Sequence, residues 1–153
     1  MDLAVVIVSY NVSALLRACL GSLFTSLKRT PDLAAEVWVV DNASSDGSAA
    51  MVAAAFPLAR LIASPENLGY SAGNNLALQG LGFTSAGEEA RPLTAYDWAA
   101  SLPRSATQPR HVWLLNPDTV VQGDAPAQLV RFLDQAPRAG ACGAQLAYPD
   151  GSF

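Results

Sequence analysis

Residues 111–119 read His-Val-Trp-Leu-Leu-Asn-Pro-Asp-Thr. An apolar run of strand-forming residues gives way to a carboxamide, a proline and a carboxylate, which predicts a buried, central strand ending in a polar turn. Proline fixes its own φ and keeps the preceding residue extended, so Pro117 turns the chain and brings Asp118 outside the sheet. We therefore expect Asn116 and Asp118 at the mouth of the sheet, where they either line a site or act as ordinary turn formers. Taken alone, the stretch favours turn formation.

The composition indicates one globular α/β domain. The chain has 153 residues, of which 51% are hydrophobic and 14% are charged, a balance that suits a packed core rather than a disordered segment. The net charge of −4 argues against a nucleic-acid-binding protein, which would need a basic face. A small nucleotide remains compatible with this charge.

The beginning of the chain predicts a cytoplasmic protein. Residues 3–8 form an apolar run that is too short to span a membrane and has no basic segment before it, as a signal peptide would. Cys19 and Cys142 are the two cysteines and lie in apolar patterns, so we expect buried, reduced thiols. His111 is the only histidine and has no cysteine nearby, which argues against a zinc site.

The remaining sequence alternates strand and helix patterns. Continuous apolar, β-branched runs are typical of strands covered on both faces. Strands are expected at residues 3–8, 37–40 and 59–63, besides the one that begins at 111. Helices are expected from an N-cap at Ser13, after the loop at 44–47, through 74–78 and from a cap at Asp124. This βαβ order predicts a Rossmann-like, mostly parallel sheet with helices on both faces.

Two further segments complete the prediction. Residues 82–109 have no sustained periodicity, and we expect a flexible insertion there, either a lid on an acceptor side or merely a tolerated excursion. Residues 140–147 are expected to begin another strand.

Polar residues follow three of the expected strands. They are Ser9-Tyr10-Asn11, Asp41-Asn42 and Asn116-Pro117-Asp118. Because ligands of open α/β sheets bind beyond the carboxyl ends of the strands, we expect these residues to form one site. The first of these turns contains no glycine and the chain has no Gly-x-x-x-x-Gly-Lys sequence, which argues against a nicotinamide cofactor and a P-loop.

The same residues suit a nucleotide. Tyr10 would stack near the base, Asp41 would accept hydrogen bonds from the base or ribose, and Asp118 would hold the diphosphate through a divalent cation. Each position also has a structural explanation: a rim aromatic for Tyr10, a turn acceptor for Asp41, a helix cap for Asp46, and loop or helix-start roles for Asn67 and Asn74.

Four motifs together resemble family 2 glycosyltransferases, most closely the rhamnosyltransferase-like members that build bacterial cell-surface polysaccharides. They are Val-Val-Ile-Val-Ser-Tyr-Asn at 5–11, Val-Val-Asp-Asn-Ala-Ser-Ser-Asp-Gly-Ser at 39–48, Asn-Leu-Gly-Tyr-Ser-Ala-Gly-Asn-Asn at 67–75 and Leu-Leu-Asn-Pro-Asp-Thr at 114–119. The motifs come in the family order and cover nearly the whole chain outside 82–109. Their joint occurrence is specific, whereas any one alone would be weak.

The resemblance implies a GT-A fold, a nucleoside-diphosphate sugar donor and a Mg²⁺ or Mn²⁺ ion. Residues 116–118 occupy the family's Asp-x-Asp position, with Asp118 as the metal ligand and Asn116 in place of the first aspartate. This substitution lowers the negative charge, so metal binding is expected to require the nucleotide. The donor-binding residues implied by the motifs are Ser9, Tyr10, Asn11, Asp41, Asn42, Asn67, Gly69, Asn74 and Asn116.

The resemblance also implies an inverting transfer to a glycan or lipid-linked acceptor. In such a reaction a cation neutralises the departing diphosphate while a carboxylate deprotonates the acceptor hydroxyl. Because that base lies downstream of the Asp-x-Asp position in the family, we expect it beyond Phe153, and we expect the chain to be a GT-A domain truncated at its C-terminus. Peripheral contact with the inner face of a membrane and self-association through an exposed sheet edge are left open.

Two other classes of function are alternatives. A non-catalytic nucleotide-sugar-binding or regulatory module is favoured by the missing base. A sugar nucleotidyltransferase on a related fold would need a glycine-rich, arginine-containing loop after the first strand, which this sequence lacks.

Overall fold

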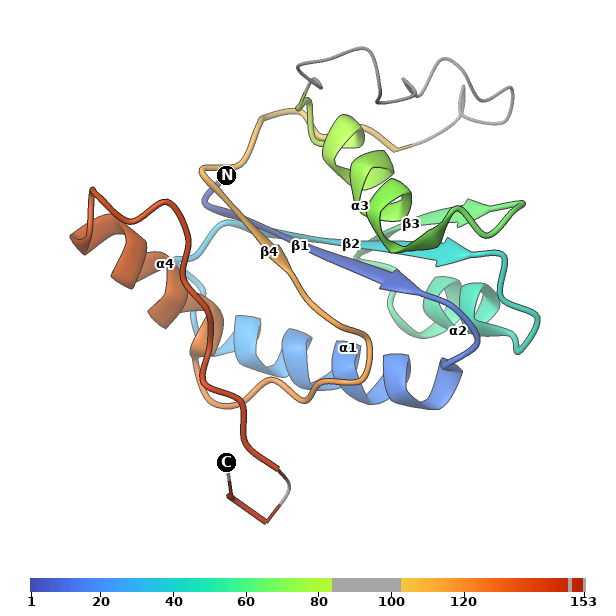
Figure 1. The fold of residues 1–153 in the computed structure, drawn as a ribbon, viewed down its shortest axis with the longest axis horizontal. Coiled ribbons are helices and arrows are strands. Elements are labelled where there is room, and N and C mark those ends of the chain that lie inside the picture. The colour runs from blue at the N-terminus through green and yellow to red at the C-terminus, as the bar shows by residue number, and fades with distance from the viewer. Residues whose placement is uncertain (84–102, 149, 153) are drawn as a thin grey trace.

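The computed structural model describes residues 1–83, 103–148 and 150–152. Most of the insertion expected at 82–109, and with it the expected flexibility or lid, therefore lies outside the described residues. The elements follow one another as β1 (Leu3–Ser9), α1 (Ser13–Lys28), β2 (Ala35–Asn42), α2 (Ser48–Ala55), β3 (Ala59–Ser64), α3 (Gly69–Gly80), β4 (His111–Leu114) and α4 (Ala125–Gln135) (Figure 1).

The strands form one parallel sheet in the order β3-β2-β1-β4. Val5 of β1 lies between Val37 of β2 and Trp113 of β4. The chain first moves outward from β1 to β3 and then returns to the other side of β1. This reversal places the topological switch point, where open α/β sheets bind their ligands, between β1 and β4. The predicted α/β class with a parallel sheet is confirmed.

Helices cover both faces of the sheet, as the sequence predicts. Leu3, Val5 and Ile7 of β1 pack with α1, α2 and α4, whereas Ala4 and Val6 pack with α3 on the opposite face (Figure 1). All of β1 is buried, which explains why its sequence is continuously apolar instead of alternating.

Helix α3 approaches the sheet closely at Gly73. A Cβ at this position would lie 2.9 Å from Cγ1 of Val8 and 3.4 Å from Nδ2 of Asn42. The missing side chain therefore lets the first half of α3 lie directly over the carboxyl ends of β1 and β2.

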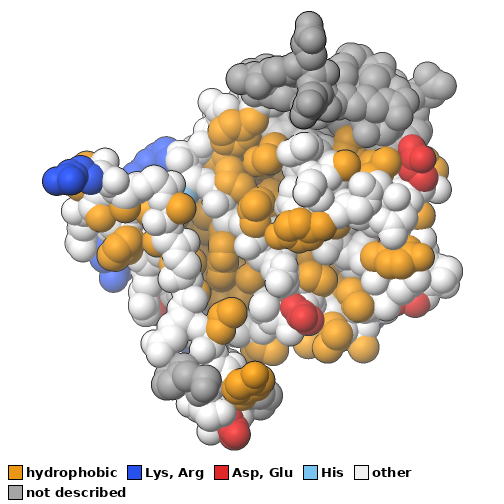
Figure 2. Space-filling view, viewed as in Figure 1, with side chains coloured by type: hydrophobic (Ala, Val, Ile, Leu, Met, Phe, Trp, Pro, Cys, Tyr) orange, Lys and Arg blue, Asp and Glu red, His pale blue; other side chains and the backbone are white. Residues whose placement is uncertain are grey.

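Three expectations about individual elements are wrong. Within the described residues β4 lies at the edge of the sheet rather than at its centre, and its Leu114 is 47% exposed; Figure 2 shows hydrophobic side chains over the centre of the face on which β4 lies. Residues 140–147 form no strand, because an apolar segment becomes a strand only with a partner strand to pair with. The N-cap of α1 is Val12 and not Ser13, which is the first helical residue.

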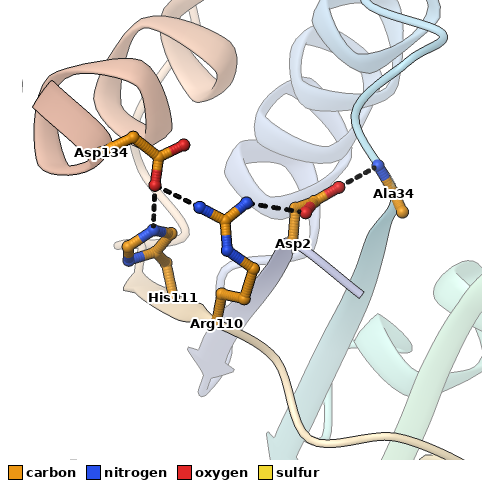
Figure 3. Close-up of polar contacts among 5 residues, drawn as sticks. All are labelled: Asp2, Ala34, Arg110, His111 and Asp134. Atoms are coloured by element: carbon orange, nitrogen blue, oxygen red, sulfur yellow. Dashed lines mark hydrogen bonds and ion pairs between the residues drawn. The ribbon is translucent and has the colours of Figure 1, made fainter.

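A polar network ties the amino ends of the strands together, away from the predicted site. The guanidinium of Arg110 bridges Asp2, at 2.9 Å, and Asp134 of α4, while Nε2 of His111 lies 3.2 Å from the same Asp134 carboxylate (Figure 3). Asp2 in turn accepts the backbone N–H of Ala34 at 3.1 Å. His111 thus joins β4 to α4.

Among the described residues, no helix is long and apolar enough to cross a membrane.

Candidate functional site

The three polar strand ends lie at one edge of the sheet. Ser9 at the end of β1 pairs in register with Asp41 of β2. On the other side of β1, the backbone N–H of Leu115 donates to the carbonyl of Val6 at 2.9 Å and extends the β4 pairing by one residue. The carboxyl ends of β1, β2 and β4 therefore lie toward the same edge of the sheet (Figure 1). Asn116 follows Leu115 directly in the sequence.

Four of the predicted site residues are buried and incompletely hydrogen-bonded. Ser9, Asp41, Asn42 and Asn74 are 1%, 2%, 2% and 5% exposed. Ser9 Oγ and the Oδ1 atoms of the other three are the buried side-chain atoms of the described residues that lack a hydrogen-bond partner. Because a buried polar atom normally finds a partner, this gathering at one edge of the sheet needs an explanation.

Asp41, Asn42 and Asn74 each have a second side-chain polar atom, and this atom hydrogen-bonds to backbone close to the strand ends. Asp41 Oδ2 accepts the N–H of Ser44 at 3.0 Å, so the turn-acceptor explanation for Asp41 accounts for one of its two oxygens. Asn42 Nδ2 donates to the carbonyl of Gly69 at 3.1 Å and fixes the start of α3 beside β2. Asn74 Nδ2 donates to the carbonyl of Tyr70 one turn earlier, at 2.9 Å.

Asn11 joins the loop after β1 to the loop after β2. Its Oδ1 accepts the N–H of Ser45 at 2.8 Å, and its own N–H donates to Ser44 Oγ at 2.9 Å. Asn11 has φ 54° and Ala43 in the facing loop has φ 61°. Positive φ is uncommon for residues other than glycine and clusters at functional sites, where the surrounding contacts hold it.

Asp46 accepts hydrogen bonds from the first residues of two helices. Oδ2 accepts the N–H of Ser13 in α1 at 2.8 Å, and Oδ1 accepts the N–H and the hydroxyl of Ser48 in α2 at 3.0 and 2.5 Å. The hydroxyl of Ser48 is the largest of the influences that lower the pKa of Asp46, followed by the N–H of Ser13. The N-cap of α2 is Gly47, so Asp46 is not itself the cap residue, but its carboxylate accepts hydrogen bonds at the start of both α1 and α2.

The remaining donor-side residues lie at the surface. Tyr10 is 50% exposed at the rim of the site. Asn67 is exposed, and its Oδ1 accepts the N–H of Gly69 at 2.9 Å in a local turn. Gly69 has φ 78° where α3 begins, a conformation that glycine adopts without strain.

Asn116 and Asp118 are both exposed on a turn at the mouth of the sheet. The carbonyl of Asn116 accepts the N–H of Thr119 at 3.4 Å and its hydroxyl at 2.8 Å, so the turn-forming prediction is confirmed. The described residues contain no group of three or more His, Cys, Asp and Glu side chains that could hold a metal ion. A single exposed carboxylate still fits a Mg²⁺ ion that takes its other oxygens from phosphate and water.

Seven of the predicted residues thus fall into two groups. Ser9, Asp41, Asn42 and Asn74 are buried where α3 meets β1 and β2, and the exposed Gly69 joins them through its carbonyl, which accepts from Asn42. Asn116 and Asp118 lie on the β4 side, and among the described residues no hydrogen bond joins the two groups.

Sequence reasoning missed the serines that connect the loops. Ser44 and Ser45 were expected to form an ordinary loop, but they hydrogen-bond Asn11 across a sequence distance of 33 and 34 residues. Their clustering with Asp46 is a local signal of capping, but it does not identify a partner in another loop.

The chain has relatives of known activity. It is 33% identical over 153 residues to the N-acetylglucosaminyl-diphospho-decaprenol L-rhamnosyltransferases of two Mycobacterium tuberculosis strains, CDC 1551 / Oshkosh and ATCC 25618 / H37Rv. The alignment covers 98% of this chain and 43% of each relative. The chain therefore spans less than half the length of these curated relatives.

Two solved structures share the fold. The crystal structure of S. aureus TarS 1–349 superimposes with a TM-score of 0.60 at 18% identity, covering 88% of this chain and 33% of TarS. The mannosyltransferase PcManGT from Pyrobaculum calidifontis, in complex with GDP-Man and Mn²⁺, gives a TM-score of 0.62 at 22% identity, covering 97% and 36%. These similarities confirm the predicted GT-A fold.

The family itself is identified by sequence. Residues 4–80 match the family model described as Glycosyl transferase family 2. The match includes the first three motifs, and the alignment with the mycobacterial relatives extends the similarity to almost the whole chain. The chain belongs to glycosyl transferase family 2.

Proposed function

We propose that the chain forms the donor-binding part of a glycosyltransferase that transfers a sugar, with inversion, from a nucleoside diphosphate to a glycan or lipid-linked acceptor. One observation carries the proposal: the buried oxygens without partners, on Ser9, Asp41, Asn42 and Asn74, all belong to the predicted donor-binding set. An unpaired buried polar atom costs about 1–3 kcal/mol. Four such atoms at one edge are best explained by a ligand.

The chemistry of these atoms favours a nucleotide. All four can accept hydrogen bonds, and a nucleobase and a ribose offer N–H and O–H donors. The exposed ring of Tyr10, on the loop that follows Ser9, adds a surface on which a base can stack. Asn11 joins the loop that carries Tyr10 to the loop that follows Asp41 and Asn42, so the two sides of such a pocket are tied to each other.

The diphosphate would lie on the β4 side. Asp118 would hold a Mg²⁺ or Mn²⁺ ion together with the phosphate oxygens, and Asn116 would offer an amide beside it without adding charge. When bound, the cation would act as a Lewis acid toward the departing diphosphate. The Mn²⁺ and GDP-Man named for PcManGT support this proposal. We assign no catalytic base to the described residues.

The acceptor class is proposed from the curated relatives. Their name describes an L-rhamnosyl transfer to an N-acetylglucosaminyl-diphospho-decaprenol, a lipid-linked acceptor. We extend this class of acceptor, and with it a role in surface polysaccharide assembly, to the present chain. Contact with the inner face of a membrane and self-association through an exposed sheet edge stay predictions.

Thermal unfolding with nucleotides tests the donor site. The chain is unfolded in the presence of UDP, dTDP and GDP and their sugars, each with and without Mn²⁺. A ligand at about a hundred times its dissociation constant adds about 2.7 kcal/mol of stability, which corresponds to roughly 5–10 °C in a domain of this size. We expect such a shift with one nucleotide, in the presence of metal only.

The control variant is Asp118→Ala. Its unfolding temperature without ligand should match that of the wild type, because the carboxylate is exposed, while the metal-dependent shift should disappear. A cooperatively folded sample that shifts with none of the nucleotides would contradict the proposed donor site. If the protein binds a nucleotide sugar tightly but transfers no sugar to an acceptor, the result would instead support the non-catalytic module.

A further inference from the structure

The loop after β4 is attached to one face of α1. Cys19, Ser22 and Ser26 are three and four residues apart, a spacing that places them on one side of the helix. Each of them hydrogen-bonds within residues 116–123. Figure 1 shows this segment running back alongside α1 after it leaves β4. We call Cys19, Ser22 and Ser26 the α1 stripe.

The two serines bind the last residues of the loop, Val121 and Gly123. Ser22 Oγ accepts the N–H of Val121 at 2.9 Å and donates to the carbonyl of Cys19 at 2.8 Å. Ser26, which is 2% exposed, donates from its hydroxyl to the carbonyl of Gly123 at 2.7 Å. Both hydroxyls therefore bind loop backbone that has no strand partner of its own.

Cys19 contacts the first residues of the loop, Asn116 and Thr119, next to the predicted metal ligand. Its thiol donates to the carbonyl of Asn116 at 3.6 Å and lies 3.7 Å from Oγ1 of Thr119. These contacts are on both sides of Asp118. Burial raises the pKa of the Cys19 thiol, hydrogen bonding with Thr119 opposes this, and the charge of Asp118 raises the pKa further. The thiol therefore stays protonated and acts as a donor.

The position of Asp118 thus depends on the loop backbone. Its side chain is exposed, so the location of the carboxylate is set by where residues 116–123 lie on α1. We infer that Cys19, Ser22 and Ser26 are positioning residues, which hold this loop so that the carboxylate of Asp118 meets a cation on the donor diphosphate. This inference rests on the proposed function. Groups that hydrogen-bond a metal ligand directly change metal affinity or activity by about 10–100-fold when they are replaced; because these residues bind the loop around Asp118 and not its carboxylate, we expect an effect at the lower end of that range.

The test uses the full chain with Ser22→Ala and Ser26→Ala, made separately, and Thr25→Ala as the matched control. Thr25 is an exposed hydroxyl residue on the same helix, and its Oγ1 donates to the carbonyl of Gly21 within α1 at 2.7 Å. Two quantities are measured on each variant: amide hydrogen exchange at residues 119–123, and the ratio of nucleoside-diphosphate affinities with and without Mn²⁺. The nucleotide is whichever of UDP, dTDP and GDP the wild type binds.

We expect faster exchange in both stripe variants and a metal-dependent affinity ratio about tenfold lower than that of the wild type, with Thr25→Ala unchanged in both. Faster exchange with an undiminished ratio would show that the stripe only supports the fold, and would overturn the inference. Unchanged exchange would overturn it as well. If the wild type itself binds no nucleotide with Mn²⁺, the proposed function fails together with the inference, and this is visible before any variant is made.

Discussion

Buried oxygens without partners distinguish the candidate site at the scale of single residues. In most of a protein core such an atom lowers the free energy of unfolding, because the hydrogen bond that it made to water in the unfolded chain is not replaced. Ser9 is the simplest case, since its hydroxyl oxygen is buried without a partner at the end of a strand that otherwise contributes only apolar side chains to the core.

Replacing Ser9 therefore separates stability from binding. We expect Ser9→Ala to leave the free energy of unfolding unchanged or to raise it by up to about 1 kcal/mol, because an unpaired hydroxyl is removed. Nucleotide affinity should fall. Urea denaturation measures the first effect and titration calorimetry the second.

Ser48→Ala is the matched control. Ser48 is also buried, at 0% exposure, but its hydroxyl donates to Asp46 at 2.5 Å. The loss of this charge-assisted bond should lower the free energy of unfolding. Equal destabilisation by the two substitutions would show that the Ser9 hydroxyl has a partner in the folded protein.

The contact between α3 and the sheet sets the geometry of the site at the scale of elements. Asn42 and Asn74 come from β2 and α3, and they lie together only because α3 rests on the ends of β1 and β2. Gly73 permits this approach, since any side chain there would meet Val8. Val8 has a β-branched side chain with little freedom to move aside.

Two glycine substitutions test this contact. In helix interiors Gly→Ala normally stabilises by about 1 kcal/mol, and Gly21 of α1 has open space for a Cβ, so Gly21→Ala should be stabilising. Gly73→Ala gains the same helix propensity but is overpacked, at a cost of about 1–3 kcal/mol. In urea denaturation we therefore expect Gly73→Ala to be less stable than Gly21→Ala by about 1–3 kcal/mol. It should also bind nucleotide more weakly than the wild type. Equal stabilities would mean that α3 can move away from Val8 without cost.

Ion pairs at the amino ends of the strands link distant parts of the whole molecule. Arg110 connects Asp2 at the start of the chain to Asp134 of α4 (Figure 3). Hydrogen bonds from Arg110 are the largest of the influences that lower the pKa values of both carboxyls below their usual range. A carboxyl with a lowered pKa in the folded state stabilises the protein above its unfolded pKa, about 3.9 for aspartate, and this contribution is lost as the pH falls through the folded-state value.

Acid should therefore unfold the protein partly through this network. We expect the unfolding temperature to fall as the pH is lowered below about 4, and Arg110→Met to make this fall shallower, because the carboxyls then titrate near their usual pKa in both states. Thermal scans between about pH 6 and 3 measure the effect. Asp46 also has a lowered pKa, so some acid dependence should remain in the variant. Identical pH profiles would show that the exposed pairs contribute nothing.

Much of the fold was predictable because its signals are local. Continuous β-branched runs and helical spacing located β1, β2, β3 and the helices, and the third strand, expected at 59–63, is found at Ala59–Ser64. Their order implied the parallel sheet, since consecutive strands joined by helices must run in one direction. The sequence by itself also located the polar residues at the strand ends.

Only the tertiary structure decided which strands pair and which side chains hydrogen-bond to each other. The edge position of β4 and the unpaired state of residues 140–147 depend on which strands are available to pair, and a local pattern carries no information on that. The same holds for Asn11 with Ser45, 34 residues apart, and for Cys19 with Asn116, 97 residues apart. Side-chain periodicity reports which face of an element is buried, whereas the hydrogen bonds that shape this site form between elements that folding brings together.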